Sequence, residues 1–274
     1  MSSTKRTVFF ISDRTGITAE TLGHSLLTQF PVTFEQITLP FVDSPERAKL
    51  ALEQIEEANR ASGERSILFS TVIDDEVRAI LRSAKAVVFD FFETFIAPLE
   101  QELKVPSSHM VGRSHGLVDN IMYDARIDAM NYALNHDDGV TTRHYTQADV
   151  ILVGVSRTGK TPACIYLALQ YGVYAANYPL TEDDLDAGGL PKLLDPYRSK
   201  LYGLTIRPER LEQIRNERRP NSRYASLRQC QYEIARAEAI FTKAGIPFIN
   251  TTTMSIEEIA TTILHERRLK RRVL

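Results

Sequence analysis

The chain has no tryptophan, only two cysteines and almost no net charge. Its 33 Lys and Arg residues nearly balance 35 Asp and Glu residues, so the formal net charge is −2 and no overall basic field is present to attract nucleic acid. Cys164 and Cys230 form no CxxC pair and have no histidine pattern beside them, which argues against a disulfide framework and a zinc site. No apolar run approaches the length of a signal peptide or a membrane span, so we expect a cytoplasmic protein without a membrane partner.

What the sequence does have is a regular alternation of short apolar, β-branched runs with helical patterns. Two helix starts are marked by Ser44-Pro45-Glu46 and by Ser255-Ile256-Glu257-Glu258, in which a serine can cap the helix and acids lie in the first turn. The alternation predicts βαβ units and parallel sheets, and therefore an α/β fold. The predicted strands are 7–12, 34–42, 66–72 and 86–90, followed by 148–155, 173–180, 201–206 and 247–252.

The strongest functional signal follows the strand predicted at 148–155. Gly154-Val155-Ser156-Arg157-Thr158-Gly159-Lys160-Thr161 fits G-x-x-x-x-G-K-[ST] in full, between a predicted strand and a predicted helix. In such a P-loop the glycines let backbone N–H groups wrap a phosphate, the lysine reaches the transferred phosphate, and the threonine hydroxyl can bind Mg²⁺. We therefore predict that all eight residues bind nucleotide phosphates, that Lys160 and Thr161 are catalytic, and that Thr161 holds the metal.

The order of elements after this loop resembles that of small P-loop kinases. We expect an N-terminal α/β domain with a parallel βαβ sheet at 1–104, a connector of loop and helix at 105–147, and a P-loop-kinase-like domain at 148–274. The connector is predicted because its first part combines Pro, Gly, Ser and His with weak periodicity. The sequence contains no Asn-Lys-x-Asp pattern and no HRD or DFG motif, which disfavours a GTPase and a eukaryotic-type protein kinase.

Further candidates rest on weaker patterns. Asp183 lies in NYPLTEDDLD, where many P-loop kinases place an acid that holds the metal or orients the acceptor; the alternative is a solvated helix cap. Arg215, Arg219 and Arg223 belong to an arginine-rich segment that forms either a lid over the transferred phosphoryl group or an ordinary charged helix surface. His115, in the loop RSHGL, is a second candidate base beside Asp183 unless its role is structural.

Three other stretches have a structural interpretation and a functional one. Asp90 ends the run AVVFD as the acid of a Walker-B-type metal site does, although a structural role is the alternative. His136-Asp137-Asp138 is interpreted as the end of a helix. Arg-Thr-Gly-x-Thr occurs at 14–18 and again at 157–161, but only the second copy has the lysine. The two copies either share turn chemistry alone or present two helix N-termini to one site.

Long stretches of the sequence are similar to the dikinase regulatory proteins, a family that includes the bacterial phosphoenolpyruvate synthase regulatory proteins and the plant and bacterial pyruvate, phosphate dikinase regulatory proteins. The similarity runs nearly from end to end and includes GVSRTGKTPACIYLALQYGVYAANYPL, ISDRTGITAETLGHSLLTQFP, YDARIDAMNYALNHDDG and NSRYASLRQC. The resemblance implies a bifunctional enzyme that phosphorylates a threonine of the dikinase with ADP as donor, which inactivates the dikinase. Its second activity removes that phosphate with inorganic phosphate and releases pyrophosphate. The resemblance also implies an ADP site at 154–161 and is compatible with a homodimer.

A mechanism can be stated on these residues. One cradle would hold a phosphoryl group in line between an oxygen donor and an oxygen acceptor in both directions. Lys160 and the loop amides, helped by Arg157 or a lid arginine, would stabilise the charge, while Thr161 and Asp183 would hold Mg²⁺. Asp183 or His115 would take the threonine proton.

The sequence indicates the reaction more directly than it indicates which protein is phosphorylated. The chain looks closer to regulators of phosphoenolpyruvate synthase, the pyruvate, water dikinase. The open alternatives are the same chemistry on pyruvate, orthophosphate dikinase, a small-molecule P-loop kinase that uses ATP, and a nucleotide-sensing module without catalysis.

Overall fold

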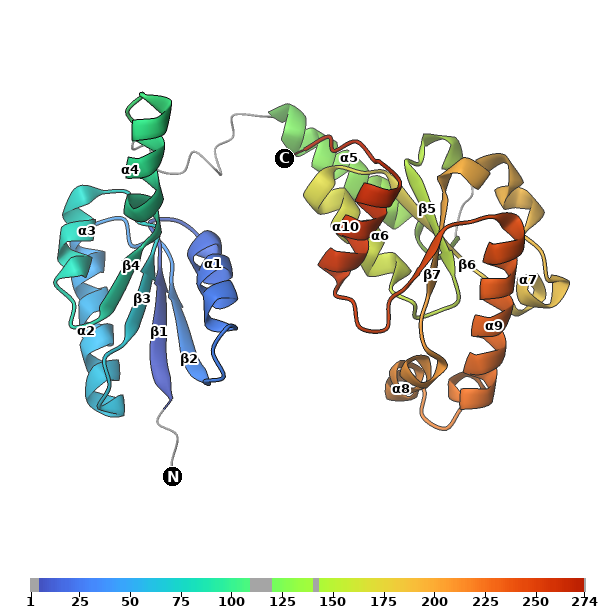
Figure 1. The fold of residues 1–274 in the computed structure, drawn as a ribbon, viewed down its shortest axis with the longest axis horizontal. Helices are drawn as coiled ribbons and strands as arrows, with labels where there is room; N and C mark the ends of the chain where they lie inside the picture. Colours follow the sequence, from blue (N-terminus) through green and yellow to red (C-terminus); the bar gives the residue numbers. More distant parts are fainter. Residues whose placement is uncertain (1–4, 109–119, 140–142, 274) are drawn as a thin grey trace. The chain divides into compact units, whose positions relative to one another are not determined.

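The computed structural model describes residues 5–108, 120–139 and 143–273, and the chain divides into two compact units, residues 1–116 and 117–274 (Figure 1). Each unit has its own parallel sheet with helices on both faces, so the predicted α/β class is confirmed. Within the described ranges, none of the helices combines the length and the apolar character that a membrane crossing requires.

The first unit alternates strands with helices along its described residues. Its sheet has the strand order β2-β1-β3-β4, and all the pairings are parallel. The elements are β1 (Arg6–Ile11), α1 (Ile17–Leu27), β2 (Phe34–Leu39), α2 (Pro45–Ser62), β3 (Ile67–Ser70), α3 (Asp75–Arg82), β4 (Val87–Asp90) and α4 (Phe91–Leu103).

Strand β1 is apolar because both of its faces are buried. Val8 and Phe10 pack with residues of α1, whereas Phe9 and Ile11 pack with residues of α2 and α3 on the other face. A strand covered by helices on both sides cannot alternate apolar and polar residues, which explains the continuous run that predicted it.

The predicted helix starts are confirmed by their capping contacts. The Ser44 side chain accepts a hydrogen bond from the Arg47 N–H, and Pro45 is the first residue of α2. At the last helix, α10 (Ile256–Glu266), Ser255 and Glu258 form a reciprocal capping box. Local side-chain chemistry therefore fixes where these helices begin.

The second unit repeats the alternation of strands and helices. Its sheet has the order β6-β5-β7-β8 and is also fully parallel. Besides α10, its elements are α5 (Asn120–Asn135), the short 3₁₀ helices η2 (Asp137–Gly139) and η3 (Tyr145–Gln147), β5 (Val150–Gly154), α6 (Lys160–Tyr171), β6 (Ala175–Pro179), α7 (Glu182–Ala187), η4 (Lys192–Lys200), β7 (Leu201–Thr205), α8 (Pro208–Arg218), η5 (Arg223–Ala225), α9 (Leu227–Ala244) and β8 (Phe248–Asn250).

The two units share one strand order. In each, the second strand along the chain lies beside the first, and the third lies on the other side of the first. The point where the strand order reverses is therefore next to β1 in the first unit and next to β5 in the second. In open parallel sheets, ligands bind outside the carboxyl ends of the strands at this position. The P-loop, which follows β5, lies there.

We expected a separate connector at 105–147, and the structure differs from this expectation in the second part of that segment. Ala129 and Ala133 of α5 are buried with residues of α6 and α10, and Tyr132 joins the core on the opposite face of the sheet. Helix α5 is thus an integral layer of the second unit, which begins well before residue 148. Helix α5 packs through a small apolar face, which gives only a weak periodic signal in the sequence.

Candidate functional site

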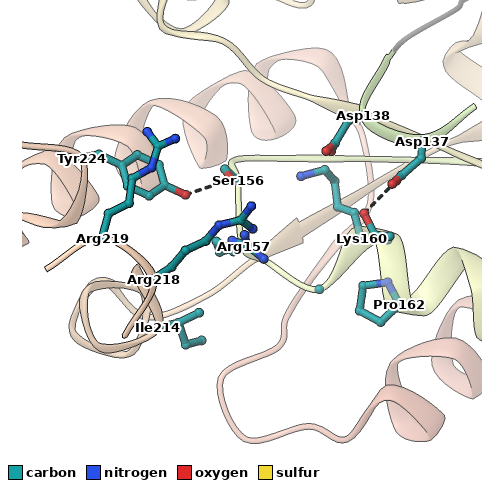
Figure 2. A pocket seen from close by; sticks show the side chains of 12 residues that line it. Asp137, Asp138, Ser156, Arg157, Lys160, Pro162, Ile214, Arg218, Arg219 and Tyr224 are labelled. Carbon is teal, nitrogen blue, oxygen red and sulfur yellow. Dashed lines mark hydrogen bonds between the residues drawn. The ribbon is translucent and has the colours of Figure 1, made fainter. Parts of the chain in front are cut away.

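A pocket of about 700 Å³ opens at the carboxyl end of β5, within the second unit (Figure 2). It brings together the P-loop, the turn η2 and the carboxyl end of α8. Its lining residues are Asp137, Asp138, Ser156, Arg157, Gly159, Lys160, Thr161, Pro162, Ile214, Arg218, Arg219 and Tyr224.

The two glycines of the P-loop are required by different constraints. A Cβ on Gly154 would lie 2.4 Å from the Leu204 carbonyl oxygen of the neighbouring strand β7, a distance that side chains do not tolerate. Gly159 has a φ of 91°, in the left-handed region, and is the N-cap of α6. No side-chain cap and no acidic residue occupy the first turn of α6, so the positive end of this helix faces the pocket.

Lys160 is buried, with 4% of its surface exposed. Its Nζ donates a hydrogen bond to the Val155 carbonyl oxygen at 2.9 Å, inside the loop. Burial lowers the pKa of this lysine to about 8, although the nearby carboxylate of Asp138 acts in the opposite direction. Figure 2 shows the amine pointing toward Asp138. The structure therefore holds a desolvated cation at the floor of the pocket, where an anionic ligand would gain most from it.

Thr161 has a carboxylate partner. Its Oγ1 donates to Asp137 Oδ1 at 2.7 Å, and the Asn177 side-chain amide donates to the same oxygen. Asn177 lies on β6 with no exposed surface, and its Oδ1 accepts a hydrogen bond from the Asp138 N–H at 3.0 Å. This buried amide fixes the η2 turn against the P-loop.

The oxygen atoms at this point suit Mg²⁺. Thr161 Oγ1 and the Asp137 carboxylate are hard oxygen donors, and Asp138 lines the same pocket. Magnesium is commonly held by one or two carboxylates together with substrate phosphates, so a complete protein cage is not required. No group of three or more His, Cys, Asp and Glu side chains that could hold a metal occurs among the described residues.

A buried arginine braces the opposite side of the loop. Arg215 has no exposed surface; its Nη2 donates to the Ser156 carbonyl oxygen at 3.2 Å and to Glu233 Oε2 at 2.6 Å. Its Nη1 donates to the Tyr224 carbonyl oxygen at 3.0 Å, and the guanidinium carbon lies 4.1 Å from the centre of that tyrosine ring. The Tyr224 hydroxyl donates to Ser156 Oγ at 2.9 Å. Helices α8 and α9 are thereby attached to the first turn of the P-loop.

The rest of the loop is held by its own hydroxyls. Thr158 is buried, and its Oγ1 donates to the Val155 carbonyl oxygen at 3.1 Å. The Thr158 carbonyl oxygen accepts from Thr251 Oγ1 at 3.2 Å, which connects the loop to the residue after β8. Arg157 stands out from this ordered loop, because it has a φ of 77° without being glycine.

Five of the eight predicted P-loop residues line one pocket, namely Ser156, Arg157, Gly159, Lys160 and Thr161, whereas the buried Gly154, Val155 and Thr158 do not line it. The structure does not bring Asp183 to this pocket. Asp183 is an exposed residue of α7 and does not line the pocket. Its neighbours Thr181 and Asp184 form a capping box, so the acidic run is the solvated helix cap given as the alternative. The carboxylate that contacts Thr161 is Asp137. His115 lies outside the described residues.

The candidate lid arginines separate into three different environments. Arg215 is the buried brace described above, Arg219 lines the pocket, and Arg223 is exposed and pairs with Glu182 at 2.8 Å. Helical spacing alone did not reveal which of them points inward. Arg218 also lines the pocket, although the sequence reasoning did not single it out.

Asp90 has the structural role given as its alternative. It accepts a hydrogen bond from Arg78 Nε at 2.9 Å, and its side chain caps α4 by accepting from the Glu93 N–H. These contacts occupy both of its carboxylate oxygens within the first unit. They leave no specific support for a Walker-B-type metal site there.

The candidate functional residues that the sequence did not indicate come from η2 and β6. Asp137 and Asp138 were interpreted as a helix end, and α5 does end at Asn135. The signal that could have found them is the dipeptide Asp-Asp followed by Gly139, which permits a tight turn with a φ of 67°. Asn177, a polar residue in an apolar strand, was the other available signal.

The repeated Arg-Thr-Gly motif has the same local backbone at its glycine. Gly16 has a φ of 81° and precedes α1, just as Gly159 precedes α6. Each loop follows the strand at which the order of its sheet reverses. Arg14, unlike Arg157, is outside the left-handed region. The two copies therefore have the same local strand–turn–helix geometry, each within its own unit.

Known proteins provide an independent comparison. The model of a family described as kinase/pyrophosphorylase matches residues 8–264. A protein of Alkalilimnicola ehrlichii is 67% identical over 273 residues with 100% of both chains covered, and one of Halorhodospira halophila is 66% identical over 269 residues with 98% of each covered. A protein of Hahella chejuensis is 54% identical over 270 residues, which cover 98% of this chain and 99% of its own. All three are named "Putative phosphoenolpyruvate synthase regulatory protein". Because the family match spans nearly the whole sequence, the chain belongs to the kinase/pyrophosphorylase family.

Proposed function

We propose that this protein regulates phosphoenolpyruvate synthase through two opposed reactions at the P-loop pocket. In the first, it transfers the β-phosphoryl group of ADP to a threonine of the synthase and inactivates it. In the second, it removes that phosphoryl group with inorganic phosphate, releases pyrophosphate and reactivates the synthase. The observation that carries the proposal is the pairing of a buried P-loop lysine, Lys160, with the Thr161–Asp137 contact in one pocket. The family description and the relatives' names support the choice of reactions and target.

The diphosphate of ADP would lie along 154–161. The backbone N–H groups of the loop and the N-terminus of α6 would bind its oxygens, and Lys160 would exchange its contact with the Val155 carbonyl for one with the transferred phosphate. Thr161 and Asp137 would hold Mg²⁺, which supplies positive charge to the phosphate oxygens when bound. Asp137 thus takes the role that the sequence had suggested for Asp183.

Proton transfer requires a base close to the transferred phosphate. Asp138 lines the pocket beside Lys160, and its turn is held by the hydrogen bond from its N–H to Asn177. We assign it the role of accepting the threonine proton as the hydroxyl oxygen bonds to the β-phosphorus of ADP, while the bond from that phosphorus to the bridging oxygen breaks and AMP leaves. In the second reaction, an oxygen of inorganic phosphate bonds to the phosphorus of the phosphothreonine, and the bond between that phosphorus and the threonine oxygen breaks. The threonine oxygen takes up the proton that the phosphate carried, and pyrophosphate leaves.

One incubation series tests the proposal. Purified protein is mixed with ADP and either phosphoenolpyruvate synthase or pyruvate, orthophosphate dikinase, and threonine phosphorylation is scored by mass spectrometry. Phosphate is then added and pyrophosphate is measured. We expect both reactions with phosphoenolpyruvate synthase, and we expect Lys160→Ala to lose both. Phosphorylation that requires ATP, or turnover of a small metabolite without any protein acceptor, would refute the proposed activity.

A further inference from the structure

Three arginine side chains gather at the end of the pocket away from the carboxylates. Arg157 comes from the P-loop, Arg218 is the last residue of α8, and Arg219 follows it. Figure 2 shows them on the side of Ser156 and Tyr224, whereas Asp137 and Asp138 lie on the side of Lys160. All line the same pocket.

These three cations are not neutralised by the part of the chain that the structure describes. None of their side chains forms a hydrogen bond or ion pair with another described residue. Two acids on the elements around the pocket already have other partners, since Glu233 binds Arg215 and Glu182 binds Arg223. Guanidinium groups that line one pocket without an acidic partner favour an anionic ligand there, and guanidinium geometry suits phosphate oxygens in particular.

The backbone of Arg157 is a second, independent observation. Its φ of 77° is unfavourable for any residue with a Cβ, and glycine would adopt it freely. A strained residue inside an otherwise well-bonded loop is typical of ligand clamps. The chain keeps an arginine where glycine would fold more easily, and the guanidinium group is what glycine could not supply.

We propose that Arg157, Arg218 and Arg219 form a second phosphate subsite, separate from the position of the nucleotide diphosphate at Lys160. Its ligand is a phosphate dianion that does not belong to the nucleotide, supplied either as inorganic phosphate or as the phosphoryl group of a phosphothreonine segment. The identity of this ligand rests on the proposed function, because that function requires a phosphate other than those of ADP. The subsite itself rests on the three unpaired arginines and the strained loop.

Binding measurements test the subsite without any turnover. Wild-type protein is saturated with ADP and then titrated with inorganic phosphate, followed by phosphorus NMR, and separately with a phosphothreonine peptide, followed by fluorescence anisotropy. We expect at least one of the two probes to bind while ADP stays bound, and the arm that binds identifies the source of the phosphate. Displacement of ADP by the phosphate probes, or binding of neither probe, would overturn the proposal.

Matched variants locate the subsite. Arg157→Gly keeps the left-handed backbone, and the double variant of Arg218 and Arg219 to Gln changes exposed side chains only. Each should weaken binding of the phosphate probe about 10-fold or more, the usual loss for a charge-assisted hydrogen bond, and the Arg218 and Arg219 double variant should change ADP affinity less than about threefold. Arg210→Gln, on an exposed part of α8 outside the pocket, should change neither. Equal losses for ADP and phosphate would assign these arginines to the nucleotide instead. If these binding measurements fail while ADP-dependent threonine phosphorylation persists, the second phosphate subsite is refuted and the proposed function is not.

Discussion

Replacing Lys160 with methionine should abolish phosphoryl transfer and yet stabilise the free protein. The lysine carries its charge in a site with 4% exposure, where water no longer solvates it. Methionine has an unbranched chain of similar shape and no charge to desolvate. The substitution therefore separates what the lysine does for a ligand from what it costs the fold.

The size of the effect follows from the contacts of this lysine. Its pKa falls from 10.5 to about 8 because of burial. That fall corresponds to about 3 kcal/mol of lost stability at pH 7, since a tenfold change in proton affinity is about 1.4 kcal/mol. The substitution also removes the hydrogen bond to the Val155 carbonyl, worth about 1 kcal/mol. That carbonyl still accepts from Thr158 Oγ1 at 3.1 Å, so it is not left unpaired. The net expectation for Lys160→Met is a gain of about 2 kcal/mol.

The gain should also depend on pH. Because the folded pKa of Lys160 lies below its unfolded value, the unfolded state binds more protons between about pH 8 and 10.5. Wild-type stability therefore rises with pH in that window, and the penalty is fully present only below it. The advantage of the methionine variant should shrink by about 1 kcal/mol between pH 7 and pH 9.

Urea unfolding followed by tyrosine fluorescence measures this difference in the relevant unit. All eleven tyrosines lie in residues 117–274, so the signal does not report on the first unit. Lys192→Met changes an exposed lysine of the same unit and should leave stability unaltered. Two results would show that the buried charge does not destabilise the wild type. The Lys160→Met variant could be no more stable than the wild type at pH 7, or its gain in stability could be as large at pH 9 as at pH 7. Pyrophosphate should stabilise the wild type but not the variant.

The remaining predictions concern the other side of the pocket and the loop backbone. Asn177→Ala should raise the Mg²⁺ concentration needed for half-maximal transfer about 10- to 100-fold, because the amide that orients Asp137 is lost; a Mg²⁺ titration of the reaction measures this. Asp137→Asn should lower turnover about 100-fold, whereas Asp183→Asn should leave it within about twofold, and the reverse order in an ADP-dependent assay would restore the sequence-based assignment. Gly154→Ala should destabilise the second unit by about 1–3 kcal/mol through its clash with β7, while Gly189→Ala, which meets no atom within 4 Å, should change urea stability by less than about 0.5 kcal/mol.

The sequence was most informative where function or structure depends on neighbouring residues. The parallel strands, the capped helix starts and the P-loop are all local patterns, and each lies where it was predicted to within a few residues. A strand buried on both faces must be apolar, and a phosphate loop must place glycine, lysine and threonine at fixed spacing. These requirements can be read without knowing how the chain folds back on itself.

The second half of the candidate site could not be found in that way. Thr161 meets Asp137 from 24 residues earlier, and Asp137 is oriented by Asn177 from 40 residues later. The contact depends on a 3₁₀ turn after α5, in which Asp138 has a φ of 49°. Asp183 was the better candidate by order along the chain, but its run satisfies a helix N-terminus instead. Only tertiary packing distinguishes these carboxylates.

The buried Arg215 also determines which part of the pocket wall can move. Separating it from Glu233 would leave a charge without a partner in the interior, which costs several kcal/mol and makes such opening rare. The exposed residues 217–221 carry no comparable restraint and include the arginines at the end of α8. Motion on the timescale of ligand exchange should therefore concentrate in this segment, while the amides of the P-loop and of α8 before Arg215 exchange slowly with solvent deuterium. The wall that we propose to receive a phosphate can then adjust to its ligand without disturbing the loop that we propose to hold the nucleotide.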